Sequence, residues 1–203
     1  MNIALIGVSG RVGSRLLAEL LSRGHSVTGI ARSAAGVAPC ASLVVKVADA
    51  TDPTQLAPLL AGHDAAISAV RFVSADPRAL IAAVERAGVP RLLVVGGAGS
   101  LEIAAGQALV DSPGFPDAYK AEAIAGRAFL DLLRAQPALD WSFLSPSAEF
   151  APGERTGKFR LGTDRLLVDA QGKSRVSMED FAIALVDELE RPAHSRQRFT
   201  VGY

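Results

Sequence analysis

Short apolar runs alternate along this chain with longer segments in which apolar residues recur at helical spacing. The first run, residues 2–7, is almost wholly apolar, which is typical of a parallel strand buried on both faces. In the next segment, 11–24, Val12 and Leu16 fall on one face of a helix that Gly24 would end. Strands that alternate with helices in this way predict an α/β fold with a parallel sheet.

The same pattern continues to the end of the chain. Further strands are predicted at 25–32, 42–49, 63–70, at 90–99 together with its following loop, at 139–147 and, as a last edge strand, at 196–203. Further helices are predicted from Asp52, over 76–88, over 116–136 and from Ser177. Asp52 caps its helix ahead of a proline. Ser177 and Asp180 stand at the two positions of a capping box. We therefore predict a doubly wound parallel sheet, the three-layer α/β/α Rossmann fold.

Residues 150–176 depart from this pattern. They are rich in glycine and charge, contain only short β-like pieces, and include a turn at 170–174. This composition predicts a hairpin or a small lobe over the strand ends, on the substrate side of the sheet. Because the chain has no repeats, low-complexity tracts or linkers, we expect residues 1–203 to form a single domain that includes this lobe.

Three glycines follow the first strand and open the first helix, at Gly7, Gly10 and Gly13. Gly7 permits the sharp exit from the strand, Gly10 lets the backbone approach a pyrophosphate, and Gly13 allows the helix to pack closely on the strand. The free N–H groups of this turn and the helix dipole favour an anion. The turn, together with Ser9 and Val12, is therefore predicted to bind a dinucleotide.

The residue at the end of the second strand indicates which dinucleotide is bound. A site for NAD places Asp or Glu there, to bind the ribose 2′-hydroxyl group. This chain has Arg32, whose guanidinium suits a 2′-phosphate, and Arg11 in the glycine turn is near enough to be a second contact. We therefore predict a preference for NADP(H) over NAD(H). The alternative is that both are ordinary surface arginines.

The G-x-x-G-x-x-G spacing, with a short second strand, resembles the atypical and extended members of the short-chain dehydrogenase/reductase (SDR) superfamily. The resemblance implies that Asp49 contacts adenine, although a turn cap is the alternative. It implies that the strand ending in Ala69 and Val70 passes the cofactor ribose, and that Pro146 lies beside the nicotinamide. Gly96 and Gly97, after the fifth strand, complete the expected cofactor site. The stretch "SMEDFA" at 177–182 resembles a helix-opening signature of the superfamily.

Proton-relaying SDR enzymes carry Tyr-x-x-x-Lys, with both side chains on one helical face. Here Tyr119 is present, but the position four residues later is Ala123. Lys120 lies about 100° around the helix and cannot take the same place. This departure argues against a classical alcohol dehydrogenase or a sugar epimerase. It leaves room for reduction of a flavin or quinone, which needs an apolar stacking surface more than a strong acid.

Four separated segments resemble the NADH-flavin reductase group of atypical SDRs, which is related to biliverdin reductase B and the NmrA-like proteins. They are "VVGGAGSLE" (94–102), "FPDAYKAEA" (115–123), "DWSFLSP" (140–146) and "PGERTGKFRLG" (152–162). The resemblance implies an NADPH-dependent reductase that passes hydride to a flavin, a quinone or a similar conjugated acceptor. A redox-sensing protein that binds NADP(H) without turnover is the alternative, and an NAD-dependent epimerase or dehydratase is a third.

The substrate pocket should lie over the carboxyl ends of the strands. Phe72 could stack on the acceptor or fill a packing gap. Ser100 could donate to a substrate carbonyl or cap a helix. Tyr119 could be a weak acid, a substrate contact or a structural tyrosine, and Phe150 would belong to the opposite wall. Ser100 and Tyr119 are the candidate catalytic residues.

Composition narrows the class of partner. Among 203 residues, 21 Lys and Arg balance 21 Asp and Glu, so no global field would attract nucleic acid or an anionic membrane. The single Cys40 is predicted to lie in a loop, and a lone cysteine fits a reducing compartment. No apolar stretch is long enough to span a membrane, and the histidines lack metal-ligand spacing. We expect a cytoplasmic protein, a monomer or homodimer, that binds a small-molecule acceptor and no metal.

Overall fold

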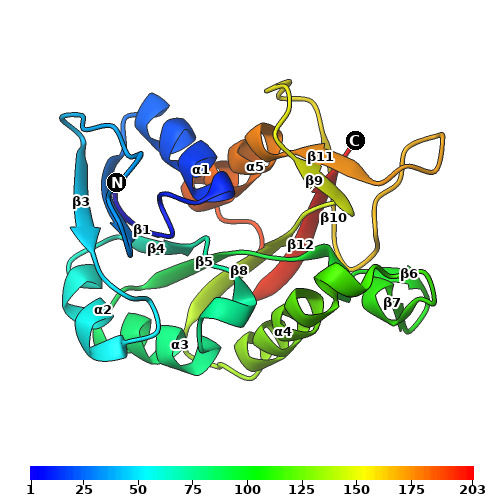
Figure 1. Cartoon of the computed structure of the whole chain (residues 1–203), viewed down its shortest axis with the longest axis horizontal. Coiled ribbons are helices and arrows are strands. Elements are labelled where there is room, and N and C mark those ends of the chain that lie inside the picture. Colours follow the sequence, from blue (N-terminus) through cyan, green and yellow to red (C-terminus); the bar gives the residue numbers. More distant parts are fainter.

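The computed structural model describes residues 1–203, and its centre is one eight-stranded sheet in the order β10-β12-β8-β5-β4-β1-β2-β3 (Figure 1). The seven parallel strands of this sheet are β1 (Asn2–Ile6), β2 (Ser26–Ala31), β3 (Leu43–Val47), β4 (Ala65–Ser68), β5 (Arg91–Val95), β8 (Asp140–Ser145) and β12 (Gln197–Gly202). β1 pairs with β2 on one side and with β4 on the other, so the strand order reverses at β1. A reversal of this kind opens a crevice at the carboxyl ends of the strands.

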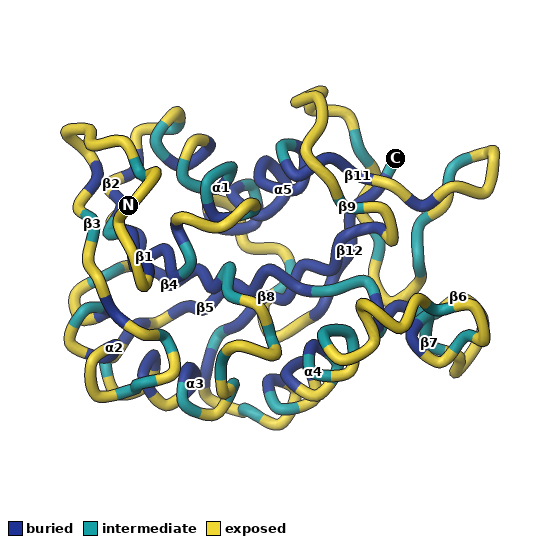
Figure 2. The backbone as a smooth tube through the Cα atoms, in the orientation of Figure 1, coloured by how far each residue is buried: buried dark blue, intermediate teal, exposed yellow.

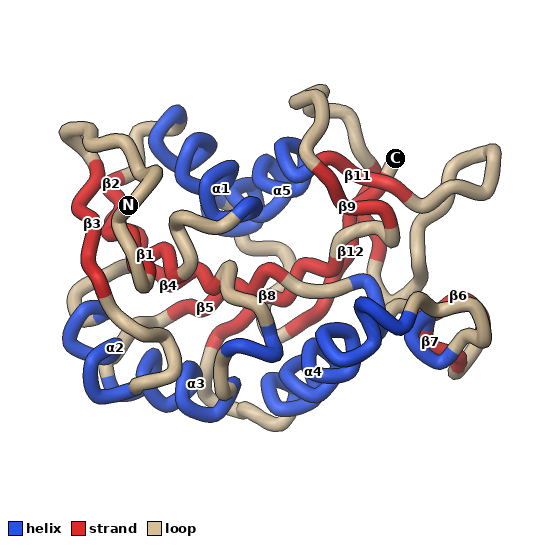
Figure 3. Tube along the Cα trace, in the orientation of Figure 1, coloured by secondary structure: helices blue, strands red, loops and turns tan.

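Helices cover both faces of the sheet. α1 (Arg11–Ser22) and α5 (Met178–Glu190) lie on one face, and α2 (Pro53–Leu60), α3 (Pro77–Arg86) and α4 (Asp117–Arg134) lie on the other, as Figures 1 and 3 show. The predicted three-layer Rossmann fold is therefore confirmed. Every predicted helix is present, with ends that differ from the predicted ones by a few residues.

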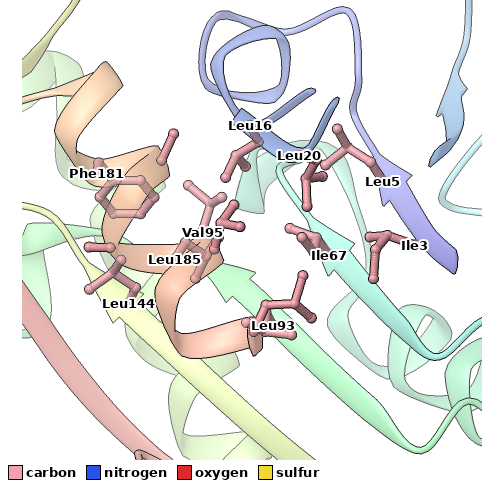
Figure 4. Packing of buried hydrophobic residues seen from close by; sticks show 14 of the residues in the cluster. Ile3, Leu5, Leu16, Leu20, Ile67, Leu93, Val95, Leu144, Phe181 and Leu185 are labelled. Carbon is pink, nitrogen blue, oxygen red and sulfur yellow. The ribbon is translucent and has the colours of Figure 1, made fainter. Parts of the chain in front are cut away.

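The two faces of the sheet support two separate cores of nearly equal size, with 22 and 21 buried residues. Figure 4 shows part of the core beneath α1 and α5, where leucines of α1 meet residues of the central strands and of α5. In Figure 2 the central strands are buried along their length, while exposed residues concentrate in the loops and on outer helix surfaces. Burial on both faces explains why these strands read as continuous apolar runs.

The helix cap predicted at Asp52 is present, and the capping box predicted at Ser177 differs from the prediction. Asp52 accepts hydrogen bonds from the N–H groups of Thr54 and Gln55, and Asp76 caps α3 in the same way. Ser177 accepts from the N–H of Asp180, but the Asp180 carboxylate does not return the bond. The capping box is therefore only half formed, because the fully buried Asp180 side chain bonds other partners.

Two of those partners belong to the lobe and the third is the last residue of the chain. The carboxylate of Asp180 accepts from the hydroxyl of Thr156, from the N–H of Gly157 at 2.8 Å and from the hydroxyl of Tyr203 at 2.9 Å. A second anchor is Arg155, whose guanidinium pairs with Glu19 of α1 at 2.9 Å. The lobe is thus tied to α5, to α1 and to the end of the chain.

Strand pairing distinguishes the two forms predicted for these residues, a hairpin or a small lobe, and corrects one other prediction. β9 (Glu149–Ala151) and β11 (Arg175–Ser177) pair in parallel, so they do not form a hairpin. β10 (Arg160–Gly162) leaves the lobe and adds antiparallel to β12. The prediction that the last strand is an edge strand was wrong, because β10 covers it. Whether β12 is covered depends on its pairing with a strand distant in the sequence, and the apolar pattern of β12 does not indicate that pairing.

A short excursion between β5 and α4 was not predicted. It holds the 3₁₀ helices η2 (Ala98–Ser100) and η3 (Leu109–Asp111) and the small hairpin of β6 (Glu102–Ala104) and β7 (Gln107–Ala108). A third 3₁₀ helix, η1 (Phe72–Ser74), follows β4. These pieces are only two or three residues long, which is too short for a periodic signal. None of the five α-helices is both long and apolar enough to cross a membrane.

Candidate functional site

A cleft of about 250 Å³ opens at the carboxyl ends of β1, β2 and β4, where the strand order reverses. Seven of the thirteen residues predicted to bind the cofactor line this cleft, namely Gly7, Ser9, Gly10, Arg32, Asp49, Ala69 and Val70. They come from three strand ends and from the turn into α1. The crevice that the topology predicts is therefore present, and the residues that the sequence indicates surround it.

The glycine turn is shaped by close backbone contacts. Gly7 has φ +90°, and its N–H donates to the carbonyl of Ile30 at 2.8 Å. A Cβ on Gly7 would lie 2.8 Å from the carbonyl oxygen of Ala69, and one on Gly13 would lie 2.0 Å from that of Gly7. Backbone atoms cannot move aside, so both positions require glycine. The predicted roles of Gly7 in the turn and of Gly13 in packing are confirmed.

The start of α1 leaves several backbone donors free. The N–H groups of Ser9, Arg11, Val12 and Gly13 have no acceptor in the protein, whereas that of Gly10 donates to the carbonyl of Gly7. No acidic residue stands in the first turn of α1 to occupy them. Free N–H groups at a helix N-terminus favour an anion, and the glycines keep side chains out of its way. This cradle suits the pyrophosphate of a dinucleotide.

Arg32 and Asp49 face the cleft from the ends of β2 and β3. One oxygen of Asp49, Oδ1, accepts from the N–H and the hydroxyl of Thr51, both at 2.9 Å. These hydrogen bonds, with a smaller contribution from the charge of Arg32, lower the pKa of Asp49. Asp49 therefore does form the turn cap, and its second oxygen has no protein donor. Neither Arg32 nor Arg11 is in an ion pair, so both guanidinium groups remain available.

Of the six predicted cofactor residues outside this lining, Arg11, Val12 and Gly13 belong to the start of α1, and the other three follow two other strands. Gly96 and Gly97 follow β5, and Pro146 follows β8. A Cβ on Gly96 would lie 2.4 Å from the ring of Phe143, so packing between these strands already accounts for this glycine. Gly97 has no such constraint, because the atom nearest to an added Cβ is 3.6 Å away in Phe72. None of the three lines the cleft described above.

The two phenylalanines predicted for the substrate pocket pack against opposite faces of the sheet. The ring of Phe72 stacks on Phe143 at 6.0 Å and meets the edge of Phe129 at 5.8 Å. The ring of Phe150 packs on Phe181 of α5 at 4.8 Å. Both side chains are half-buried. Packing, which was the alternative for Phe72, is thus observed, and contact with a substrate stays a prediction for both.

The two candidate catalytic residues are loosely held. Tyr119 lies in the first turn of α4 with 67% of its surface exposed, and its hydroxyl has no partner. Ser100 ends η2, and its hydroxyl is 3.5 Å from the guanidinium of Arg198, which is a long contact. Ala123, where a relay lysine would stand, faces η2, since a Cβ on Gly99 would lie 2.5 Å from its own. The structure therefore contains no Tyr–Lys pair aimed at the strand ends.

Two features of the site were missed from the sequence. Arg71, Ser74 and Ala75 also line the cleft, on the segment that follows β4. A basic residue directly after a predicted cofactor strand was the available signal for Arg71. Glu122 of α4 accepts hydrogen bonds from the N–H groups of the same segment, and nothing in the sequence indicated it. No group of three or more His, Cys, Asp and Glu side chains is arranged to bind a metal ion.

Comparisons with known proteins indicate an NAD(P)H-binding family. The model of a family described as NAD(P)H-binding matches residues 7–192. A solved structure of a proposed exported protein from Burkholderia pseudomallei is 47% identical, with a TM-score of 0.90, and the match covers 100% of both chains. That of a proposed epimerase from Bacteroides thetaiotaomicron is 42% identical, with a TM-score of 0.95, over 100% of this chain and 96% of the other. That of a proposed NADH-flavin reductase from Streptococcus pneumoniae is 36% identical, with a TM-score of 0.83, over 100% and 99%.

Proposed function

Since this chain belongs to the NAD(P)H-binding family, with the Rossmann fold of an atypical SDR, we propose that it is an NADPH-dependent reductase of a flavin, a quinone or a similar conjugated acceptor. The family match and the solved relatives support a general NAD(P)H oxidoreductase. The preference for NADPH is a more specific proposal and rests on the residues of the cleft. The conjugated acceptor is also more specific and rests on the residues of α4.

One observation carries the cofactor assignment. Four unpartnered N–H groups at the start of α1 meet a cleft whose edge carries the unpaired Arg32, and Arg11, also unpaired, belongs to the glycine turn. The N–H groups would hold the pyrophosphate, Arg32 would pair with the 2′-phosphate, and Arg11 would be a second contact to it. The free Oδ2 of Asp49 would accept from adenine. A carboxylate in place of Arg32 would repel the same phosphate, so this edge favours NADPH.

The proposed class of acceptor follows from the absence of a Tyr–Lys relay on α4. When bound, NADPH supplies a hydride, and the acceptor takes its second hydrogen as a proton. The exposure of Tyr119 and the packing of Ala123 against η2 leave no relay that could protonate a carbonyl oxygen. A flavin or quinone tolerates this, because water or a weak hydroxyl such as that of Ser100 can deliver the proton. The name of the Streptococcus pneumoniae relative points to the same acceptor class.

The proposal is tested by NADPH oxidation with the purified protein in the presence of FMN, FAD or a small quinone. We expect at least one acceptor to stimulate oxidation, and NADPH to support a higher kcat/KM than NADH. If no acceptor in the panel stimulates oxidation, the reductase proposal fails. Arg78→Ala, which removes an exposed and unpaired arginine of α3, is the matched control for arginine variants of the cleft.

The exposure of Tyr119 also favours a second candidate, a redox-sensing protein that binds NADP(H) without turnover. The neutral net charge means that such a sensor would act through a protein partner rather than on DNA. Equal affinity for NADP⁺ and NADPH, with no acceptor reduced, would support it. An epimerase, the proposed activity of the Bacteroides thetaiotaomicron relative, requires proton transfer that Ala123 does not provide here.

A further inference from the structure

One wall of the cofactor cleft takes its hydrogen bonds to the rest of the protein from a single side chain of α4. Residues 71–75, the wall segment, follow β4 and contribute Arg71, Ser74 and Ala75 to the cleft. The carboxylate of Glu122 accepts from the N–H of Phe72 at 2.8 Å through one oxygen and from that of Val73 at 3.1 Å through the other. These are the only hydrogen bonds that join the wall segment to another element, since the N–H of Ser74 donates locally to Arg71.

The face of α4 that carries Glu122 is shaped to receive this segment. Glu122, Gly126 and Phe129 are spaced at i, i+4 and i+7, so they lie along one stripe of the helix. A Cβ on Gly126 would come within 2.8 Å of the Phe72 ring, and Phe129 meets the ring edge. Hydrogen bonds and ring packing therefore dock the wall segment on one line of α4.

Glu122 holds this wall through both oxygens of its carboxylate. Each of its two oxygens accepts one backbone N–H group of the segment. Its remaining contact, to Nε of Arg71, is 3.8 Å long, and the Arg71 side chain is 73% exposed. An exposed ion pair of that length contributes little. The two backbone hydrogen bonds to a charged acceptor are the strong part of the arrangement.

We propose that Glu122 is a positioning residue that sets cofactor affinity by fixing the wall segment on α4. This inference rests on the proposed function only in requiring that the cleft bind NADP(H). Without the carboxylate, residues 71–75 lose every hydrogen bond to the rest of the protein. Arg71, Ser74 and Ala75 would then have to be ordered when the cofactor binds, and that ordering weakens binding. At saturating NADPH, the loss of the Glu122 carboxylate should change the turnover number little.

The test combines a binding measurement with a direct measurement of the wall segment. We expect Glu122→Ala to raise the Kd for NADPH at least tenfold and to accelerate hydrogen exchange at the amides of Phe72 and Val73. Glu122→Gln keeps one acceptor oxygen and should fall between Glu122→Ala and the unaltered protein in both measurements. Glu85→Gln and Glu85→Ala, which alter an exposed carboxylate of α3 without a side-chain partner, should change neither.

Other outcomes overturn the proposal. A Kd within twofold of the unaltered protein in a folded Glu122→Ala variant would show that the wall segment needs no clamp. A fall in turnover at saturating NADPH with an unchanged Kd would place Glu122 in the chemistry instead. If Glu122→Ala does not fold, the exchange rates and Kd of Glu122→Gln decide. Failure to reduce any acceptor sinks the reductase assignment but leaves the Kd comparison valid, and failure to bind NADPH sinks both.

Discussion

Gly13 packs so closely on the carbonyl group of Gly7 that a Cβ at position 13 would lie 2.0 Å from the carbonyl oxygen. We expect Gly13→Ala to lower the free energy of unfolding by about 3 kcal/mol, the upper end for overpacking, because the obstacle is backbone. The displaced turn should also lose its affinity for NADPH. Gly114→Ala, at an exposed glycine whose added Cβ meets nothing within 4 Å, should change neither quantity. Urea unfolding and NADPH titration check both expectations, and a stable Gly13→Ala variant with unchanged affinity would contradict them.

Arg32→Ala should separate the two dinucleotides. The loss of a hydrogen bond from a charged group to the 2′-phosphate should weaken NADPH binding by about 1.5–3 kcal/mol. NADH, which lacks that phosphate, should bind with nearly the same Kd as before. Titration of both nucleotides into this variant and into Arg78→Ala, the control on α3, measures the difference. An equal loss for NADPH and NADH would mean that Arg32 does not contact the 2′-phosphate.

Ala123→Lys should not create an alcohol dehydrogenase, although it restores the spacing of the SDR relay. The side chain at 123 points at Gly99 of η2, so a lysine there would have to push η2 aside or turn away from the cleft. We expect a loss of about 1–3 kcal/mol in unfolding free energy and no oxidation of a panel of secondary alcohols with NADP⁺. Ala121→Lys, on the exposed surface of the same helix, should be nearly neutral. Alcohol oxidation by Ala123→Lys would show that position 123 reaches the substrate.

The protein should lose stability in acid through a buried carboxylate, Glu188. Burial raises the pKa of Glu188, but hydrogen bonds from the side chain and N–H of His194 and from Ala193 outweigh this and hold it below its ordinary value of 4.5. A lowered pKa contributes stability that is present above the ordinary value and is lost as the pH falls through the lowered one. The free energy of unfolding should therefore decline between about pH 5 and pH 3.

Glu188→Gln tests that assignment. It removes the charge that pairs with the buried Arg91 at 2.7 Å and leaves Arg91 its second ion pair, with Asp140 at 2.8 Å, so stability at pH 7 should drop by about 1.5–3 kcal/mol. Between pH 5 and pH 3, the unfolding free energy of Glu188→Gln should decline less steeply than that of the unaltered protein, because the variant lacks one titrating group. Urea unfolding across this range gives both slopes, with Glu85→Gln as the control. Equal slopes would show that other carboxylates account for the acid sensitivity.

The part of the site that the sequence revealed is the part built from short stretches of chain. Gly7, Gly10 and Gly13 follow one strand, and Arg32 and Asp49 end or follow the next two. Parallel strands bring their carboxyl ends to the same edge, so a correct order of elements was enough to place these residues around one cleft. Turn chemistry and apolar periodicity act over a few residues, and each can be read without knowing where the rest of the chain lies.

The remaining features depend on contacts between distant residues. Fifty positions separate Phe72 from Glu122, and the rotation of α4 on the sheet determines that Glu122 meets η1 while Ala123 meets η2. Adjacent helical positions differ by about 100° in direction. A rotation of α4 by one residue would therefore exchange the contacts of positions 122 and 123. β10 covers β12, and Tyr203 bonds Asp180, for the same kind of reason. Local sequence thus determined the glycine turn and the absence of the relay lysine, whereas packing of distant elements determined the wall of the cleft, the direction of Ala123 and the covered last strand.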